Sequence, residues 1–254
     1  MADKKLELVR KNLNKLLFVH YSCQSFTDDN EGYSPRITSI AVLFNDGHIL
    51  KSFSIHFVAE VLHIKRDEIE KHYDEIEKVM LESFFEFAQS HFDHYWLHWN
   101  MSNINYGFEG LEHRYNVLAN KMPYHVDEEK RINLSKLITY KYGNHCVDDP
   151  KMVNLMELNG GKHRDYLSGQ EEVEAFKNKE YLRLHKSTMC KVYWFSMIFY
   201  KLINNEVKTK KINWKIVFKI IFEHPVMQIL SLLAMIFSTS TGISWLIKLV
   251  IDKK

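Results

Sequence analysis

The stretch HWNMSNINYGFEGLEHRY, residues 98–115, joins two segments of different periodicity. Residues 95–99 before its turn are a short aromatic and apolar run typical of a strand, whereas residues 107–119 repeat apolar side chains at the three- and four-residue spacing of a helix. The turn between them is rich in amides. The stretch therefore predicts a strand that ends in a polar turn and passes directly into a helix.

Three further strands are predicted on the N-terminal side of this turn. Residues 16–22, 36–45 and 48–57 are short runs rich in β-branched and aromatic side chains. Asp46-Gly47 separates the second run from the third, and this dipeptide favours a tight hairpin because Gly accepts a positive φ. We therefore expect three consecutive antiparallel strands.

Helical periodicity dominates the remaining soluble part of the chain. It indicates one long helix over residues 66–91, a strand passing into a helix over 131–143, and a short helix at 150–158. A long or slightly broken helix is expected over 171–202. This order predicts an α/β fold, with a mixed central sheet flanked by helices.

Three polar positions stand at the ends of these elements: residues 20–24, the turn in 98–115, and RLHKSTMCKVYWFSMIF at 183–199. With the element order, they resemble the DEDD-type exonucleases of the ribonuclease H-like superfamily over about residues 14–204. Such enzymes hold two divalent cations with four carboxylates, which balance the charge of the metal ions during phosphodiester hydrolysis.

The motif positions of this chain lack those carboxylates. The first motif has His20 and Ser22 at its two acid positions, or Tyr21 and Cys23 if the alignment moves by one. The second has Asn103 or Asn105. In the third, His185 matches the family, but Cys190 stands five positions later, where the family has an acid. We therefore expect a catalytically inactive frame with no metal or other cofactor. The alternative is an active exonuclease that uses acids from the loop after the first strand, which are Asp28, Asp29 and Glu31.

An inactive nuclease frame can still bind a strand of nucleic acid in its cleft. Aromatic side chains can stack on bases, amides can bind base edges, and cations can bind phosphates. The residues expected to form such a site are His20, Tyr21, Gln24, His98, Trp99, Asn100, Asn103, Asn105, Tyr106, Arg114, His185, Lys186, Ser187 and Lys191. The expected ligand is single-stranded DNA or an oligonucleotide. The alternative is that aromatic residues such as Trp96, Trp99 and Tyr106 belong to the core.

The charge pattern divides the chain into an N-terminal part and a tail. Net charge is only +2, but residues 226–247 contain no charged side chain, and 22 residues of helix extend roughly 33 Å, enough to cross a bilayer. The preceding segment, 207–224, carries five lysines and Trp214 and suits an anionic cytoplasmic lipid surface. The cysteines are isolated in sequence, which argues against a disulfide framework or zinc knuckle.

These patterns predict a cytoplasmic domain over residues 1–206, a basic amphipathic segment over 207–224 and a single transmembrane helix over 225–251 in the cell membrane. The alternative for the tail is a buried helix that packs on the sheet. Small and polar residues recur near one face of the predicted span, where they favour close helix packing or a polar pore. They include Gln228, Ser231, Ser238, Thr241 and Gly242. We therefore expect a homo-oligomer.

The combined layout resembles the transmembrane effectors of the Hailong anti-phage defence system. That resemblance implies a membrane ion channel that is controlled by DNA oligomers, which a partner nucleotidyltransferase makes. Two other interpretations remain open from the sequence. One is a membrane-tethered exonuclease, and the other is a membrane-anchored scaffold.

Overall fold

The computed structural model describes residues 2–24, 34–102 and 106–210, together with the single positions 225, 229 and 235. The chain divides into two units, residues 1–210 and 211–254, and the description below concerns the first. Among the described residues, no helix is both long and apolar enough to cross a membrane. The predicted span lies outside the described residues except at Pro225, Ile229 and Met235, and all five of its predicted interface or pore residues lie outside them.

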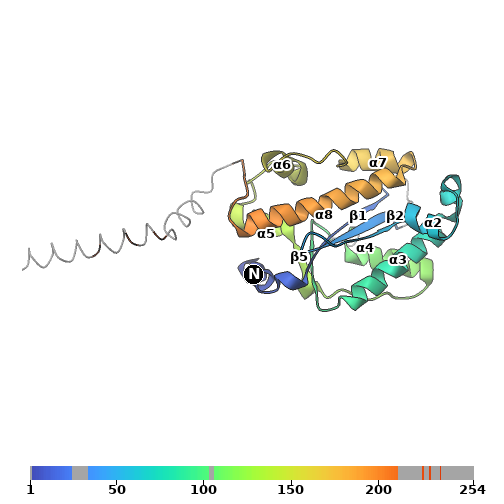
Figure 1. Ribbon diagram of the computed structural model, residues 1–254, viewed down its shortest axis with the longest axis horizontal. Coiled ribbons are helices and arrows are strands. Elements are labelled where there is room, and N and C mark those ends of the chain that lie inside the picture. Colours follow the sequence, from blue (N-terminus) through green and yellow to red (C-terminus); the bar gives the residue numbers. More distant parts are fainter. Residues whose placement is uncertain are drawn as a thin grey trace, which may run out of the picture. The chain divides into compact units, whose positions relative to one another are not determined.

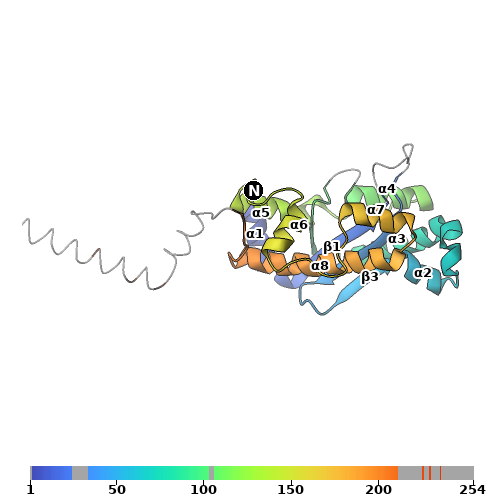
Figure 2. The same cartoon turned by 90° about the horizontal axis from the view of Figure 1, so that it is seen from above.

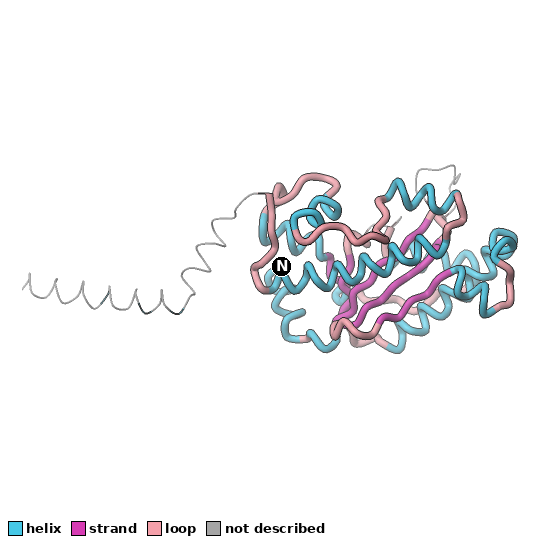
Figure 3. The backbone as a smooth tube through the Cα atoms, turned by 45° about the horizontal axis from the view of Figure 1, so that its top comes forward, coloured by secondary structure: helices cyan, strands magenta, loops and turns pink. Residues whose placement is uncertain are grey.

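A five-stranded mixed sheet forms the centre of the unit (Figures 1 and 3). Its strands, in spatial order, are β3 (Leu50–Ser54), β2 (Ile37–Phe44), β1 (Leu16–Cys23), β4 (Tyr95–His98) and β5 (Arg131–Asn133). The first three pair antiparallel, whereas β1, β4 and β5 pair parallel. The predicted meander is thus confirmed, and Gly47 in its hairpin has a φ of 73°.

Helices flank the sheet, as predicted (Figures 1 and 2). They are α1 (Ala2–Lys11), α2 (Ile55–Val61), α3 (Tyr73–Ser90), α4 (Phe108–Ala119), α5 (Leu134–Tyr142), α6 (Lys151–Leu158), α7 (Gly169–Lys177) and α8 (Tyr181–Ile203). Short 3-10 turns add η1 (Leu13–Lys15), η2 (Arg66–His72) and η3 (Glu128–Lys130). Helix α8 packs along β1 and β2.

Strand β1 is buried on both of its faces, which determines where its polar side chains point. Side chains alternate between the two faces of a strand. Val19 and Tyr21 belong to the hydrophobic core shared with α3 and α4, whereas Phe18 belongs to the core shared with α8. The same alternation places His20 and Ser22 on the α8 face of the sheet.

Element boundaries differ from the sequence prediction in several places, among them residues 66–91, where the 3-10 turn η2 precedes α3. The strand predicted over residues 48–57 ends at Ser54, and α2 follows because Ile55, Val58 and Ala59 are buried at helical spacing. The helix predicted over 171–202 as long or slightly broken is divided into α7 and α8, between which Lys179 adopts a left-handed φ of 58°. This interruption allows α7 to turn back and pack against α8.

Candidate functional site

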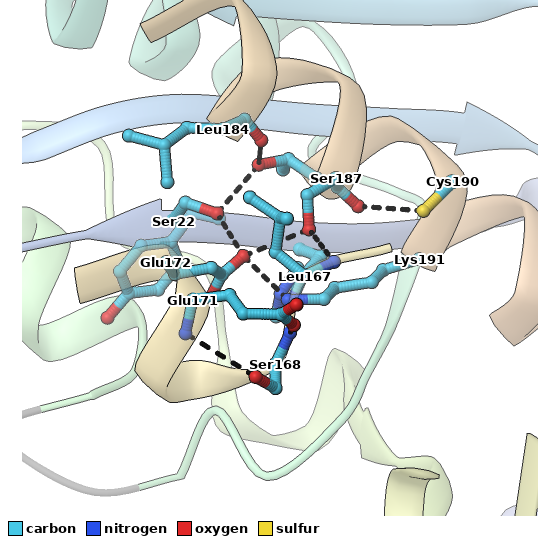
Figure 4. Close-up of polar contacts among 12 residues, drawn as sticks. Ser22, Leu167, Ser168, Glu171, Glu172, Leu184, Ser187, Cys190 and Lys191 are labelled. Carbon is cyan, nitrogen blue, oxygen red and sulfur yellow. Dashed lines mark hydrogen bonds and ion pairs between the residues drawn. The ribbon is translucent and has the colours of Figure 1, made fainter. Parts of the chain in front are cut away.

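A nearly buried ion pair lies where β1 ends beneath α8 (Figure 4). The Lys191 ammonium donates to Glu172 Oε1 over 2.6 Å, and the two side chains are only 5% and 16% exposed. The same carboxylate oxygen accepts hydrogen bonds from Ser22 Oγ at 3.0 Å and Ser187 Oγ at 3.1 Å. Three donors from β1 and α8 therefore converge on one oxygen from α7.

Buried hydroxyls extend this network into the sheet. Thr188 Oγ1 lies 2.8 Å from Ser22 Oγ and 2.7 Å from Ser39 Oγ, which comes from β2. On the other side, the Lys191 ammonium lies 5.2 Å from the centre of the Tyr166 ring, close enough for a cation–π interaction. Ionic groups carry a large desolvation cost inside proteins, so these contacts are what permit the pair to be buried.

Local helix geometry explains how the partners meet. Ser187, Thr188 and Lys191 lie on neighbouring positions of one face of α8, because residues three and four apart are adjacent on a helix. Helix α7 begins with a capping box, in which Ser168 and Glu171 satisfy each other's backbone amides. The cap fixes the first turn of α7 and so positions Glu172.

The Lys191–Glu172 pair makes the charge near the first motif position different from that of a nuclease centre. A nuclease centre has a surplus of carboxylate charge, which attracts divalent cations. Here the Lys191 ammonium already balances the charge of Glu172, and it would repel a metal ion placed next to it. Within the parts of the chain that the structure describes, no group of three or more His, Cys, Asp or Glu residues is arranged to hold a metal ion.

The third motif position holds a neutral thiol. Cys190 Sγ lies 3.2 Å from the Ser187 carbonyl oxygen, and burial raises the pKa of Cys190 to about 11. At neutral pH this side chain is therefore protonated, and it supplies no negative charge at the position where the resemblance implies a carboxylate.

Three histidines of the predicted site are buried in the uncharged form. Burial, with a smaller effect of Lys191, lowers the pKa of His20. Burial, followed by the Arg131 guanidinium, lowers the pKa of His98 to about 3. Burial, followed by the imidazole of His56, lowers the pKa of His185 to about 4. None of these side chains offers a cation for a phosphate at neutral pH.

Two predicted ligand contacts have internal partners instead. Trp99 is 6% exposed and packs against Trp194 and Phe195, with ring centres 5.4 Å and 6.3 Å away. Arg114 joins α4 to α3 through bonds to the buried Glu77, the shorter of which is 2.6 Å. The structure therefore gives Trp99 a place in the core and gives Arg114 an ion pair.

The remaining members of the predicted set differ in accessibility. Tyr21 is buried, and its hydroxyl accepts the Gly107 amide N–H at 2.9 Å. Asn100 and Lys186 are exposed, whereas Gln24 and Tyr106 are partly exposed. Asn103 and Asn105 lie outside the described residues, as do the alternative acids Asp28, Asp29 and Glu31.

The sequence analysis named Ser187 and Lys191 as site residues and Ser22 as a motif position, but it missed their shared partner. Glu172 comes from α7, which the sequence analysis placed with α8 in one long or slightly broken helix. The pattern Ser168-x-x-Glu171 signals where α7 starts, but the break between α7 and α8 lies further along, at residues 178–180. No local signal connects Glu172 with Ser22, because their contact spans 150 positions.

No protein-family model matches this sequence, and neither a curated protein nor a solved structure matches it. The resemblance to exonucleases therefore rests on the element order and on the motif positions.

The first prediction concerns the buried ion pair. Lys191→Met should lower the free energy of unfolding by about 3–5 kcal/mol, because it leaves the Glu172 carboxylate buried without its cation. Adding Glu172→Gln should recover part of this loss, which a double-mutant cycle in urea would measure. Arg183→Met, which removes an exposed pair with Glu180 on the same helix, is the control and should cost less than about 1 kcal/mol. Additive losses in the double variant would show that the pair does not couple.

The second prediction concerns acid stability. The folded pKa of His185, about 4, lies below its ordinary value of 6.5, so between these pH values the unfolded chain takes up a proton that the folded chain does not. The free energy of unfolding should therefore fall with falling pH, by about 1.4 kcal/mol per pH unit from this group. In His185→Gln, the free energy of unfolding measured by urea titration should fall less steeply between pH 6 and 4.5. An unchanged slope would contradict the assignment of a neutral His185.

Proposed function

We propose that residues 1–206 form a catalytically inactive, exonuclease-like domain of the ribonuclease H-like type that binds a single-stranded oligonucleotide. The observation that carries this proposal is the Lys191–Glu172 pair at the end of β1. The Lys191 ammonium balances the Glu172 carboxylate, so this carboxylate has no uncompensated charge with which to retain a metal ion. Cleavage would additionally require a means of activating water, which the pair does not provide.

The arrangement of the motif positions supports this proposal. Residues 20–24 are at the carboxyl end of β1, the amide-rich turn follows the carboxyl end of β4, and the third motif is on α8, which packs over β1. Because β1 and β4 are parallel neighbours, their ends meet at one edge of the sheet. Three segments that are distant in sequence thus share one edge.

Accessible polar groups on the three motif segments suit a nucleic acid strand. Lys186 offers a cation for a phosphate, and Asn100 and Gln24 offer amides for base edges. Tyr106 is the partly exposed aromatic side chain of the set, and its hydroxyl hydrogen-bonds the Tyr21 carbonyl oxygen at 3.1 Å. We assign the ligand contact to these four residues, with the buried members of the predicted set acting as their support.

The tail supports a function at the cell membrane. A lysine-rich segment and an uncharged stretch of 22 residues follow the domain. We propose that the protein is a self-assembling membrane effector of anti-phage defence, an ion channel or membrane-disrupting protein whose state is controlled by the bound DNA oligomer. A partner nucleotidyltransferase would supply the oligomer. The alternative of a tethered exonuclease requires acids from residues 25–33, and a membrane-anchored scaffold would not require a ligand.

The third prediction tests the ligand. A fluorescent single-stranded DNA should bind the full chain, and its affinity should fall as salt rises, because binding neutralises phosphates and releases counterions. Lys186→Gln should weaken binding and reduce the salt dependence, whereas Lys71→Gln, exposed on η2, should not. Fluorescence anisotropy between about 50 mM and 200 mM salt would measure both effects. Equal affinity for all three proteins would remove Lys186 from the site.

The fourth prediction tests the membrane assignment. The full chain expressed without ligand should arrest growth and release ions from loaded vesicles, whereas a chain ending at residue 210 should do neither. Ser238→Leu should retain membrane insertion but lose ion flux, because leucine is apolar yet blocks close helix approach. Leu232→Val, at a position expected to face lipid, is the matched control. Equal toxicity of the truncated chain would contradict the membrane-effector proposal.

A further inference from the structure

The carboxyl ends of β4 and β5, at His98 and Asn133, border a cavity. There a pocket of about 560 Å³ opens between α1, α5 and the turn that follows β4. Its lining residues are Lys5, His98, Met101, Ser102, Glu109, Glu128, Arg131, Asn133, Lys136, Leu137 and Tyr140. Clefts at the carboxyl ends of parallel strands are frequent ligand sites in α/β proteins. None of these residues belongs to the Lys191–Glu172 network.

Helix α5 presents a cation and an aromatic ring to this pocket one turn apart. Lys136 is exposed, and Tyr140, four positions further along α5, is 57% exposed. Four positions on a helix correspond to about 6 Å along its axis. Lys5 of α1 adds a second ammonium to the pocket, where it donates to the Arg131 carbonyl oxygen at 3.2 Å.

Acidic groups at the pocket reduce its net positive charge. The Arg131 guanidinium pairs with both Glu109 and Glu112, so it compensates only one of these two carboxylates. Glu128 is exposed on η3 at the pocket wall. A carboxylate in this position can accept hydrogen bonds from a sugar hydroxyl or an exocyclic amine, groups that an inorganic anion lacks.

The floor of the pocket contributes neutral polar groups that are fixed by their own contacts. His98 Nδ1 accepts the Met101 amide N–H at 3.0 Å, which sets the orientation of the buried ring. The Asn133 amide donates to Asn100 Oδ1 at 3.2 Å and to Ser102 Oγ at 3.4 Å. The pocket thus combines two ammonium groups, an aromatic ring, a carboxylate and oriented neutral side chains.

We propose that this pocket binds one nucleoside phosphate. The phosphate lies between Lys5 and Lys136, and the base stacks on Tyr140, one helical turn away. The Glu128 carboxylate receives the sugar or the base. The nucleotide has two possible sources, a free mononucleotide or the terminal nucleotide of an oligonucleotide, and only the second rests on the proposed function.

The experiment uses the full chain in detergent, with AMP, adenosine and inorganic phosphate as probes in isothermal titration calorimetry. AMP should bind more tightly than either of its parts. Tyr140→Leu and Lys136→Gln should each lower the affinity for AMP by at least about fivefold, because the first removes the stacking contact and the second removes the phosphate contact. Phosphate binding should depend on Lys136 and not on Tyr140. Tyr193→Leu and Lys71→Gln, exposed on α8 and η2, are matched controls and should leave AMP binding unchanged.

Competition with a 5′-phosphorylated single-stranded DNA separates the two sources. If the DNA displaces AMP, the pocket holds the end of an oligonucleotide, and if both bind together, it holds a free nucleotide. Either result supports a nucleotide pocket. Absence of AMP binding, or AMP binding that is indifferent to both pocket variants, would overturn the inference. DNA that fails to bind while AMP binds would refute the proposed function and leave the pocket intact.

Discussion

Strand β1 runs through the middle of the sheet with helices over both faces, so its side chains from Leu16 to Ser22 are all buried. Polar residues at the end of such a strand need partners inside the protein. Ser22 obtains them from α7 and α8, and the resulting network connects the sheet to the last helix. The chemistry of the site is therefore a consequence of how β1 is buried.

The sequence predicted much of this architecture, because the relevant signals are local. Period-two runs and Asp46-Gly47 specify the meander, and apolar spacing specifies α3 and α4. Other features could not be predicted from the sequence, because they depend on tertiary packing. Residues 55–57 are apolar enough to read as strand, and only the burial of Ile55 with Val58 reveals a helix. The site was harder to predict, since whether Trp99 faces a ligand or the core depends on the packing of α8.

The charge at the motif positions distinguishes an active nuclease centre from the site in this protein. An active centre needs uncompensated carboxylates to retain divalent ions, whereas this site contains a carboxylate whose charge Lys191 already balances. The neutral Cys190 thiol and the neutral histidines add no negative charge. On this account, binding of a nucleic acid strand would be retained without its cleavage. Affinity would then come from accessible groups on the three motif segments, and the buried groups would hold those segments in place.

The claim that the protein binds a nucleic acid strand without cleaving it can be tested most directly with an end-labelled single-stranded DNA. The DNA is incubated with the full chain in magnesium, in manganese and in a chelator. Both the bound fraction and the length of the DNA are read from the same samples. The account predicts equal binding in all three conditions and intact DNA throughout. DNA that is shortened only when a divalent metal is present, or binding that the chelator abolishes, would show that metal ions occupy the place assigned to Lys191.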